Sequence, residues 1–499
     1  MPQPPRLLLI HPRDNVAVAL EDLCAGHDAE LAGRAVAIRE DIPCGHKVAI
    51  VPIAPGQQAV KYGQPIGQAT SPIAVGVWVH SHNLRSNLSG MEHYVYEPQF
   101  TPLPPIDDRL TLDAFVRPNG DIGIRNELWI LPTVGCVNEI AQSLARRFQP
   151  ALASRAIDGV FAFSHPLGCS QLGDDHRNTQ EILAGLARHP NTAGVLVLGL
   201  GCENNSVESL RQVLGDDPPE RYRFLVAQEA DDEFEAGLAC LESLAQQAER
   251  CRRQPVPLAR LRVGLKCGGS DGFSGITANP LLGRVSDALV ARGAAALLTE
   301  VPEMFGAESL FMNRCANRDV FDRCAAMVNG FKQYFLLHGQ PVGENPSPGN
   351  KAGGITTLEE KSLGCLQKGG TAPVADVLPY AGRIAGPGLQ FIAGPGNDMV
   401  SLTLLAAAGA HLVLFSTGRG TPLGGPVPTV KIATNTPLAR RKPNWIDFDA
   451  GRLLSGATMP ELADELLALL LRIADGSAKT RNEINGFREI AIWKSGVTL

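Results

Sequence analysis

Between residues 128 and 202 the chain repeats one pattern, an apolar run followed by a helical stretch. Three such runs, at 128–131, 159–163 and 194–198, are apolar throughout, which is typical of strands buried on both faces. Stretches with helical periodicity lie between them, for example 139–148 and 179–188. This alternation predicts an α/β fold with a doubly wound, mostly parallel sheet.

A Gly-Cys dipeptide follows each of these runs, and the cysteines Cys136, Cys169 and Cys202 are 33 residues apart. That spacing is about the length of one strand-plus-helix unit, so the three thiols are expected at one edge of the sheet. Two interpretations stay open. Small thiols after glycine can simply pack tightly in the interior. Alternatively, they are ligands of iron or of an iron–sulfur cluster.

The rest of the chain divides around proline-rich breaks. Residues 1–97 contain short alternating runs separated by turn signals such as Tyr62-Gly63, which predicts a small β-rich domain. Four prolines between positions 97 and 105 favour an extended connector. A second proline-containing break, at 253–257, precedes another series of strands and helices. The predicted organisation is therefore a β-rich domain (1–97), a linker (98–114), an α/β domain (115–252) and a C-terminal α/β domain (258–499).

Composition excludes several classes of partner. The net charge of the 499 residues is −6, and the basic residues are scattered, so neither nucleic acid nor an anionic membrane is expected as a partner. The densest basic run, at 440–442, is interpreted as a solvated surface. No apolar run is long enough to span a membrane. Eleven cysteines without a secretion signal predict reduced thiols and a cytoplasmic location.

The loop from Cys267 to Pro280 carries the strongest functional signal. It follows an apolar run at 261–265 that is expected to be a buried strand. Its glycines allow close approach of the backbone to a ligand. Because α/β proteins bind ligands beyond the carboxyl ends of their strands, we expect a binding site here. Short polar side chains lie between the glycines, namely Ser270, Asp271, Ser274, Thr277 and Asn279, although a single loop of this kind can also be a solvated turn.

In the β-rich domain, His80 and His82 are two residues apart after a predicted strand, so both imidazoles share one face of an extended segment. Imidazole is a suitable ligand for iron, manganese or zinc, although a histidine can also be structural. A metal-binding role would require this small domain to fold back onto the larger part of the chain.

Other loops combine small polar residues with a basic one, namely Lys351, Lys368 and Arg419. Such loops are suited to carboxylates or phosphates. A Walker A sequence and a strand-linked Gly-x-Gly-x-x-Gly are both missing, so nucleotide binding and a nucleotide-dependent transferase are not favoured. The many hydroxyl and amide side chains better suit a polyhydroxylated acid.

Taken together, the motifs closely resemble those of the altronate/galactarate dehydratase family, in the same order and over essentially the whole chain. The matching segments are 61–67, 80–83, 117–138, 163–165, 168–176, 199–205, 267–280, 299–308, 345–354 and 416–420.

The resemblance implies a hydro-lyase that converts D-altronate to 2-dehydro-3-deoxy-D-gluconate in bacterial hexuronate catabolism. It also implies an N-terminal SAF (β-clip-type) domain and dependence on Fe²⁺, sometimes assisted by Mn²⁺. His80 and His82 are then the expected metal ligands, with Cys136, Cys169 and Cys202 as rivals for a second or alternative site, where an iron–sulfur cluster stays open. The expected proton-transfer groups are His165, His176, Lys351 and Lys368. Arg125 and Arg419 are expected to bind the substrate carboxylate. The residues expected to bind its hydroxyl groups are Ser270, Asp271, Thr277 and Asn279.

Each of these roles has a structural alternative; Asp174, Asp175 and His176, for instance, could cap the helix that follows. Two other functions compete with the main prediction. Galactarate dehydration would need a further cation for the second carboxylate, and a non-catalytic sugar-acid binding protein would not need the metal ligands or proton-transfer groups. A homodimer is the expected assembly only because it is the commonest one among soluble enzymes.

Overall fold

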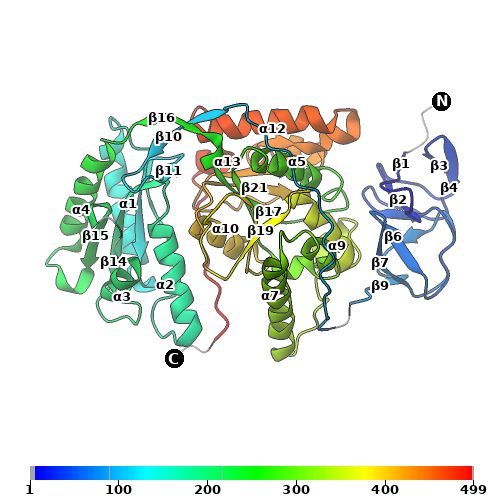
Figure 1. Cartoon of the computed structure of the whole chain (residues 1–499), viewed down its shortest axis with the longest axis horizontal. Coiled ribbons are helices and arrows are strands. Elements are labelled where there is room, and N and C mark those ends of the chain that lie inside the picture. The colour runs from blue at the N-terminus through cyan, green and yellow to red at the C-terminus, as the bar shows by residue number, and fades with distance from the viewer. Residues whose placement is uncertain (1–5, 89, 216, 218, 497–499) are drawn as a thin grey trace.

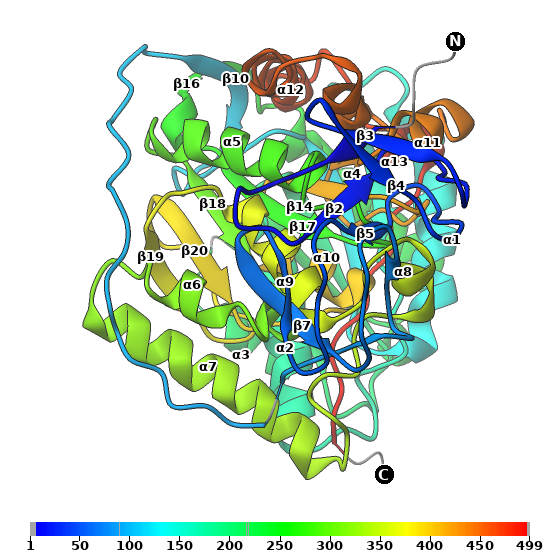
Figure 2. The same cartoon turned by 90° about the vertical axis from the view of Figure 1, so that its right-hand side faces the viewer.

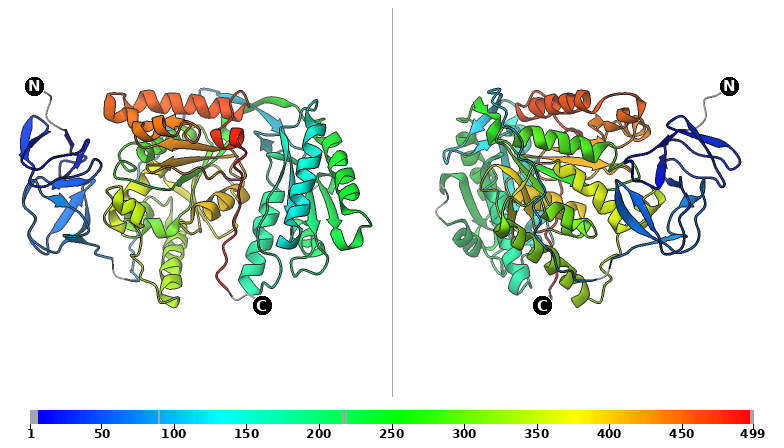
Figure 3. Two further views of the ribbon diagram at one scale, coloured as in Figure 1. Left: turned by 180° about the vertical axis from the view of Figure 1, so that it is seen from behind. Right: turned by 45° about the vertical axis from the view of Figure 1, so that its right-hand side comes forward.

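The computed structural model describes residues 6–88, 90–215, 217 and 219–496. Its elements form three units in a row, which we call the N-terminal unit (6–85), the second unit (127–248) and the C-terminal unit (262–496). The C-terminal unit lies in the middle, and the other two lie at its opposite sides (Figures 1 and 3). The N-terminal unit and the second unit are therefore far apart, although they are close in sequence.

The N-terminal unit is built from short antiparallel strands, as predicted. Its sheets have the orders β1-β2-β5-β8, β3-β4 and β6-β7-β9. The hairpin between β6 and β7 turns at Tyr62-Gly63, where both residues have positive φ (60° and 70°). This geometry matches the right-handed twist of the flanking strands. The strands are β1 (Leu7–Leu8), β2 (Val16–Ala19), β3 (Asp28–Leu31), β4 (Arg34–Ala37), β5 (Lys47–Ala49), β6 (Gln58–Lys61), β7 (Gln64–Ala69), β8 (Trp78–Val79) and β9 (Leu84–Arg85).

An extended connector, residues 86–88 and 90–110, runs along the outside of the C-terminal unit (Figure 2). It is fixed there by hydrogen bonds, such as that from the Tyr96 hydroxyl to the Cys315 carbonyl (2.6 Å) and that from the Ile106 amide to the Ala291 carbonyl (2.8 Å). The proline-rich segment is therefore extended, as expected.

The proline-containing stretch at 253–257, which the sequence indicated as a break, is in fact a strand. It is β16 (Arg253–Pro257) and pairs antiparallel with β10 (Thr111–Val116), which also pairs with β11 (Ile122–Gly123). Because β16 lies at the edge of this three-stranded sheet, its prolines need not donate hydrogen bonds to a further strand. The break was misread because an edge strand tolerates proline where a central strand does not.

The second unit has a parallel four-stranded sheet in the order β13-β12-β14-β15. The three predicted strands are confirmed as β12 (Glu127–Pro132), β13 (Gly159–Ala162) and β14 (Thr192–Gly199), and β15 (Tyr222–Val226) completes the sheet. Helices α1 and α4 share a core on one face, and α2 and α3 pack on the other. They are α1 (Asn138–Phe148), α2 (Gly173–Ala187), α3 (Val207–Leu214) and α4 (Glu233–Ala248).

The C-terminal unit is a second doubly wound domain with seven parallel strands, in the order β19-β20-β18-β17-β21-β22-β23. The strands are β17 (Arg262–Cys267), β18 (Ala295–Leu298), β19 (Val374–Leu378), β20 (Gly388–Ile392), β21 (Leu412–Thr417), β22 (Thr429–Ala433) and β23 (Phe448–Asp449). The helices are α5 (Ala278–Val290), α6 (Glu308–Met312), α7 (Arg318–Leu337), α8 (Pro348–Ala352), α9 (Leu358–Leu366), α10 (Asp398–Ala407), α11 (Thr436–Arg441), α12 (Met459–Ala474) and α13 (Arg481–Asn485).

Helices α2 and α10 join the two parallel sheets into one body. Their buried side chains form a single hydrophobic core with Trp129 and Phe163 of the second unit and Phe415 of the C-terminal unit. The helices can approach closely because a Cβ on Gly185 would lie only 2.7 Å from the Ala407 carbonyl oxygen. Among the described residues, no helix is both long and apolar enough to cross a membrane.

Candidate functional site

The central strands β17 and β21 mark the point where the chain of the C-terminal unit changes direction across its sheet. After β17 the chain crosses to β18 on one side, and after β21 it crosses to β22 on the other. Such a switch point leaves a crevice beyond the carboxyl ends of the strands. Here the two loops are joined, because the Gly268 amide donates to the Ser416 carbonyl (3.0 Å) and the Arg419 amide to the Gly269 carbonyl (2.8 Å).

The N-terminal unit covers this crevice, so it does fold back onto the larger part of the chain. Glu360 of α9 is the main anchor, because its carboxylate forms ion pairs with Lys47 and Lys61, both at 2.9 Å and all fully buried. The backbone of Gly45 packs so closely that a Cβ on Gly272 would lie 2.0 Å from the Gly45 carbonyl oxygen. Burial opposes ionisation of Glu360, but the two lysines outweigh it and lower the pKa of Glu360 to about 2.

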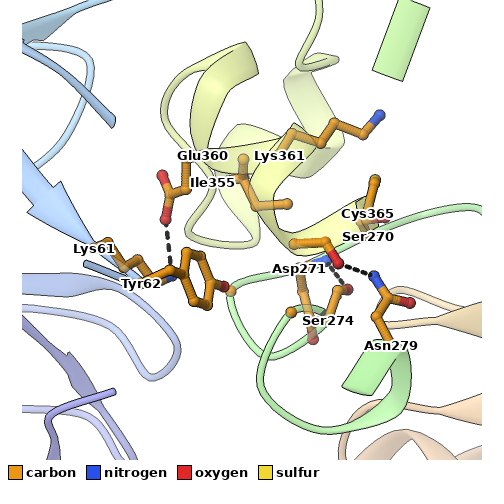
Figure 4. A pocket seen from close by; sticks show the side chains of 13 residues that line it. Lys61, Tyr62, Ser270, Asp271, Ser274, Asn279, Ile355, Glu360, Lys361 and Cys365 are labelled. Atoms are coloured by element: carbon orange, nitrogen blue, oxygen red, sulfur yellow. Dashed lines mark hydrogen bonds and ion pairs between the residues drawn. The ribbon is translucent and has the colours of Figure 1, made fainter. Parts of the chain in front are cut away.

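Tyr62 extends from its hairpin turn into the C-terminal unit (Figure 4). Its ring occupies space that two glycines leave free, since a Cβ on Gly275 would lie 2.5 Å from the Tyr62 hydroxyl oxygen, and Gly364 is adjacent. A small enclosed pocket lies beside the ring, lined by Lys61, Ser270, Asn279, Lys361 and Cys365 among others. Residues from the N-terminal unit, the loop after β17 and helix α9 therefore meet at one place.

Two thiols and a carboxylate converge at the inner end of this pocket. The Sγ atoms of Cys267, at the end of β17, and Cys365, on α9, are 3.3 Å apart. The Glu303 carboxylate lies 3.2 Å from the Cys365 sulfur and 3.7 Å from the Cys267 sulfur. Among the described residues this is the one group of three or more such donors whose ligand atoms all lie within 4.8 Å of one another, and all three residues are buried.

Buried lysines surround this donor cluster. Lys368 lies 3.0 Å from the Cys267 sulfur and also pairs with Glu300, which in turn pairs with Lys266. Lys361 pairs with Glu303 at 2.9 Å. A hydrogen bond from Cys365 is the main reason that the pKa of Cys267 is lowered, and the Lys368 ammonium group contributes. Burial opposes ionisation of Glu303, but Lys361 and its neighbours outweigh it and lower its pKa to about 2. Cys267 and Glu303 are thus favoured as anions, whereas the hydrogen bond with Cys267 and burial raise the pKa of the Cys365 thiol.

A larger cavity of about 570 Å³ opens on the other side of Asp271, between the N-terminal and C-terminal units. Three arginines line it, Arg6, Arg419 and Arg441, together with Asn435 and Thr436. Asp271 lines both this cavity and the inner pocket. The volume of the large cavity and its positively charged, polar lining suit a small hydroxylated acid.

Several residues that the sequence analysis predicted are found at this site. Asp271, Ser270 and Asn279 line the inner pocket, and Arg419 lines the large cavity. The buried Ser270 hydroxyl has no hydrogen-bond partner in the described structure, so it is free to bind a ligand. Lys368 is part of the lysine set around the donors. Lys351 lies nearby on α8, where its carbonyl oxygen contacts the His80 ring at 3.0 Å.

Two of the predicted substrate ligands instead have structural roles. The Thr277 hydroxyl is hydrogen-bonded to the carbonyls of Phe273 (3.1 Å) and Thr434 (2.7 Å) and fixes the loop. Arg125 is buried away from the site, where its guanidinium forms a two-point ion pair with Glu483 (2.7 and 3.1 Å) and also donates to two carbonyls. The prediction for Arg125 is wrong because the side chain is buried outside the crevice and four of its five N–H groups are held by this network.

The predicted proton-transfer groups His165 and His176 belong to the second unit and lie far from the crevice. The His165 ring bonds the Pro132 carbonyl (2.8 Å) through Nε2 and the Leu167 amide (3.2 Å) through Nδ1. Asp174, Asp175 and His176 do not cap α2, whose N-cap is Leu172 without a side-chain cap. Asp175 instead accepts hydrogen bonds from the amides of Ser495 and Gly496 (2.9 and 2.7 Å) near the end of the chain.

The predicted metal ligands are divided between opposite ends of the molecule. His80 and His82 lie in the N-terminal unit, whereas Cys136, Cys169 and Cys202 lie in the second unit (Figure 3). His80 is buried with both ring nitrogens in contact, with the Lys351 carbonyl (3.0 Å) and the Ser81 hydroxyl (3.0 Å). Burial lowers the pKa of His80. His82 is exposed. His80 therefore joins the N-terminal unit to α8, and no single centre uses both sets of ligands.

Sequence reasoning missed the donor cluster, although its residues lay in motifs already singled out. Glu300 and Glu303 follow β18, the neighbour of β17, so their carboxylates stood at the same edge of the sheet. Cys365 and Lys361 were harder to find, because α9 reaches the site only through tertiary packing. The missed signal was two carboxylates directly after a buried strand.

Iron fits the donor cluster better than manganese does. Thiolates favour soft or borderline metals, whereas manganese prefers oxygen ligands. Cys267, Cys365 and Glu303 provide two sulfurs and one carboxylate in a buried site that favours the anionic forms of Cys267 and Glu303. The Cys365 thiol, whose pKa is raised by its hydrogen bond with Cys267 and by burial, would lose its proton on binding the metal. The His80 and His82 pair offers no comparable set, since the described residues place no third donor with it.

Comparison with known proteins assigns the whole chain. Three family models match in order: "Altronate/galactarate dehydratase SAF domain" over residues 5–87, "D-galactarate dehydratase/Altronate hydrolase, second domain" over 114–249 and "D-galactarate/Altronate dehydratase, C-terminal" over 258–498. The chain is 55% identical to the altronate dehydratase of Escherichia coli (strain K12) and 51% identical to that of Bacillus subtilis (strain 168), in each case over 98% of this chain and 99% of the relative. It is 33% identical to the galactarate dehydratase (L-threo-forming) of Escherichia coli (strain K12), over 94% and 93%.

Proposed function

Because this chain belongs to the D-galactarate/altronate dehydratase family, we propose that it is a hydro-lyase that converts D-altronate to 2-dehydro-3-deoxy-D-gluconate and water. The identity of 55% and 51% to altronate dehydratases over nearly the full length carries the choice of substrate, since the galactarate dehydratase is only 33% identical. The crevice at the carboxyl ends of β17 and β21 is the proposed active site.

The cavity provides positive charge for the substrate carboxylate. Arg419, on the loop after β21, and Arg441, at the end of α11, line it from two sides of the crevice. Arginine binds a carboxylate with two parallel hydrogen bonds and thereby fixes its orientation. The polar side chains of Asn435 and Thr436 line the same cavity and are suited to substrate hydroxyls.

Dehydration requires removal of the C2 proton, departure of the C3 hydroxyl as water, and tautomerisation of the enol to the 2-keto acid. Ferrous iron held by Cys267, Cys365 and Glu303 would supply Lewis acidity to stabilise negative charge on the substrate. Lys361 is suited to protonate the leaving hydroxyl, since it lines the inner pocket. Burial opposes its charge, but the Glu303 carboxylate outweighs that effect and raises the pKa of Lys361, so it enters the reaction protonated.

Asp271 is proposed to hold the site together. Burial raises its pKa, but its carboxylate accepts hydrogen bonds from Ser274 (3.1 Å), Thr434 (2.9 and 3.0 Å) and Asn435 (3.0 Å). These bonds connect the loop after β17 to the loop after β22, which forms part of the cavity wall. We therefore assign Asp271 a positioning role between the large cavity and the inner pocket.

We further propose a cytoplasmic location, because all eleven cysteines are unpaired and four of them are buried. A homodimer stays a prediction, and light scattering of the purified protein would test it.

The test of the proposed function is an anaerobic assay of iron-loaded protein with D-altronate and, in parallel, galactarate, detecting the 2-keto product. We expect turnover of D-altronate at least tenfold faster than that of galactarate. Removal of iron with a chelator should abolish the activity, and Fe²⁺ should restore it. Turnover of neither acid by the iron-loaded protein would refute the proposal, and faster turnover of galactarate would refute the substrate.

A further inference from the structure

The second unit places three cysteines on three adjoining loops at one edge of its sheet. Cys136, Cys169 and Cys202 follow β12, β13 and β14, which are neighbours in the sheet. The loops are bonded to one another, because the Gly135 amide donates to the Leu167 carbonyl (3.0 Å) and the Asn205 amide to the Gly168 carbonyl (2.9 Å). The Ser170 amide also donates to the Asn204 side chain (2.8 Å). We call Cys136, Cys169 and Cys202 the cysteine triad.

A glycine precedes each cysteine and allows the loops to meet. A Cβ on Gly168 would lie 2.0 Å from the Thr133 carbonyl oxygen, and one on Gly135 would lie 2.9 Å from the His165 carbonyl oxygen. Gly168 and Gly201 also have positive φ, 105° and 130°. The glycines therefore allow the loops to approach closely, and this brings the three cysteines to the same edge of the sheet.

All three thiols of the triad are exposed, although cysteine is among the residues most often buried. The packing interpretation of the three Gly-Cys dipeptides is therefore wrong, since none of these thiols fills a core position. An exposed thiol contributes nothing to core packing and is open to chemical reaction. Three of them on mutually bonded loops are better explained by a ligand that they bind together.

The local electrostatics favour an anionic ligand. Helices α1, α2 and α3 begin at Asn138, Gly173 and Val207, shortly after the three cysteines. Their N-termini therefore lie at the same edge of the sheet. The amide groups and dipoles of helix N-termini stabilise bound negative charge.

The spacing of the thiols argues against a single ion bound by all three. Among the described residues, a set of three donors within 4.8 Å of one another is found only at Cys267, Glu303 and Cys365, so the triad is spaced more widely than that. A single ion brings its ligands close together, whereas an iron–sulfur cluster binds each thiolate through a different iron atom. We propose that the cysteine triad binds a [4Fe–4S] cluster, in a site separate from the active-site crevice and independent of which acid the enzyme dehydrates.

The test uses full-length protein, purified anaerobically and reconstituted with ferrous iron and sulfide. We expect about four acid-labile sulfides per chain, visible charge-transfer absorbance that bleaches with dithionite, and an electron paramagnetic resonance signal in the reduced protein. The single variants Cys136→Ser, Cys169→Ser and Cys202→Ser should each lose most of the labile sulfide. Because the three side chains are exposed, the melting temperatures of the apo variants should stay close to that of the apo wild type.

Matched controls are Cys24→Ser, an exposed cysteine of the N-terminal unit, and Cys240→Ser, on α4 of the second unit. Both should retain the cluster signals, and Cys267→Ser should also retain them because it lies at the other site. Uptake of iron or zinc without labile sulfide would overturn the proposal. So would cluster signals that persist in the triple variant C136S/C169S/C202S.

Discussion

The Lys368 ammonium group lies 3.0 Å from the sulfur of Cys267, at the carboxyl end of the central strand β17. Both side chains are buried, so this contact is protected from water and from screening by salt. The lysine comes from the short helix that follows α9, and the cysteine ends a strand, so the contact fixes α9 against the sheet. It also stabilises the thiolate that would bind iron.

Replacing Lys368 should therefore weaken iron binding. A Lys368→Met variant retains much of the side-chain volume but removes the positive charge beside Cys267. Loss of an outer partner of this kind typically lowers metal affinity roughly 10- to 100-fold. Competition with a chromophoric chelator would measure the change.

The matched control is Lys332→Met, which removes another fully buried lysine, paired with Glu308 elsewhere in the same unit. Iron affinity should not change in that variant even if its stability falls. Equal loss of affinity in both variants would show that Lys368 acts only through the general stability of the fold.

Attachment of the N-terminal unit should be sensitive to acid. The pKa of Glu360 is lowered from 4.5 to about 2 in the folded protein, despite the opposing effect of burial, by Lys47 and Lys61. Between these values the unfolded chain binds more protons than the folded one, so the stabilisation is complete above pH 4.5 and is lost as the pH falls toward 2. Its size is on the order of 3 kcal/mol. Thermal melts between pH 6 and pH 3 should show the loss.

In a Glu360→Gln variant the part of the acid dependence due to Glu360 should disappear, and the protein should be less stable at neutral pH. Glu465→Gln is the control, because the ion pair of Glu465 with Arg452 is exposed and contributes little. If the wild type and Glu360→Gln lost stability in parallel on acidification, Glu360 would not be the group responsible.

The sequence predicted the framework well because the framework depends on local patterns. The strands at 128–131, 159–163 and 194–198 were recognised from continuous apolar runs, and all three belong to the parallel sheet of the second unit, where β13 is an edge strand. The stretch at 253–257 was misread because proline in an edge strand looks like a break. Such an edge position is a property of the sheet and has no local signature.

The site was predicted in part, for a related reason. The loop after β17 was recognised because its glycines and short polar residues are typical of a binding loop. Helix α9 was not, because its Glu359, Glu360 and Lys361 have the composition of an exposed surface, and yet all nine residues of the helix are buried. Arg441 is exposed, as predicted, but nothing in the sequence indicated that it also lines the cavity. Which charged groups are enclosed depends on how the units dock.

The cavity arginines should contribute mainly to substrate binding. Arg419→Ala and Arg441→Ala each remove one charged donor from the cavity wall. A hydrogen bond to a charged group is worth about 1.5–3 kcal/mol, so we expect KM to rise roughly 10- to 100-fold for the residue that binds the carboxylate. Steady-state kinetics with D-altronate would measure it. Arg440→Ala changes an exposed neighbour and should leave KM unaltered. Unchanged KM in both cavity variants would place the carboxylate elsewhere.

Arg125 should affect stability rather than substrate binding. Its buried guanidinium is paired with Glu483 and also bonds the Ile473 carbonyl (2.7 Å), so it connects the strand region before β12 to α12 and α13. Breaking a buried pair on one side typically costs about 3–5 kcal/mol, because the remaining charge is left without a partner. We expect Arg125→Met to lower the melting temperature strongly, and the milder Arg125→Lys to lower it less. In whichever variant folds, KM for D-altronate should equal that of the wild type. A tenfold rise of KM at unchanged melting temperature would instead indicate that Arg125 binds the substrate.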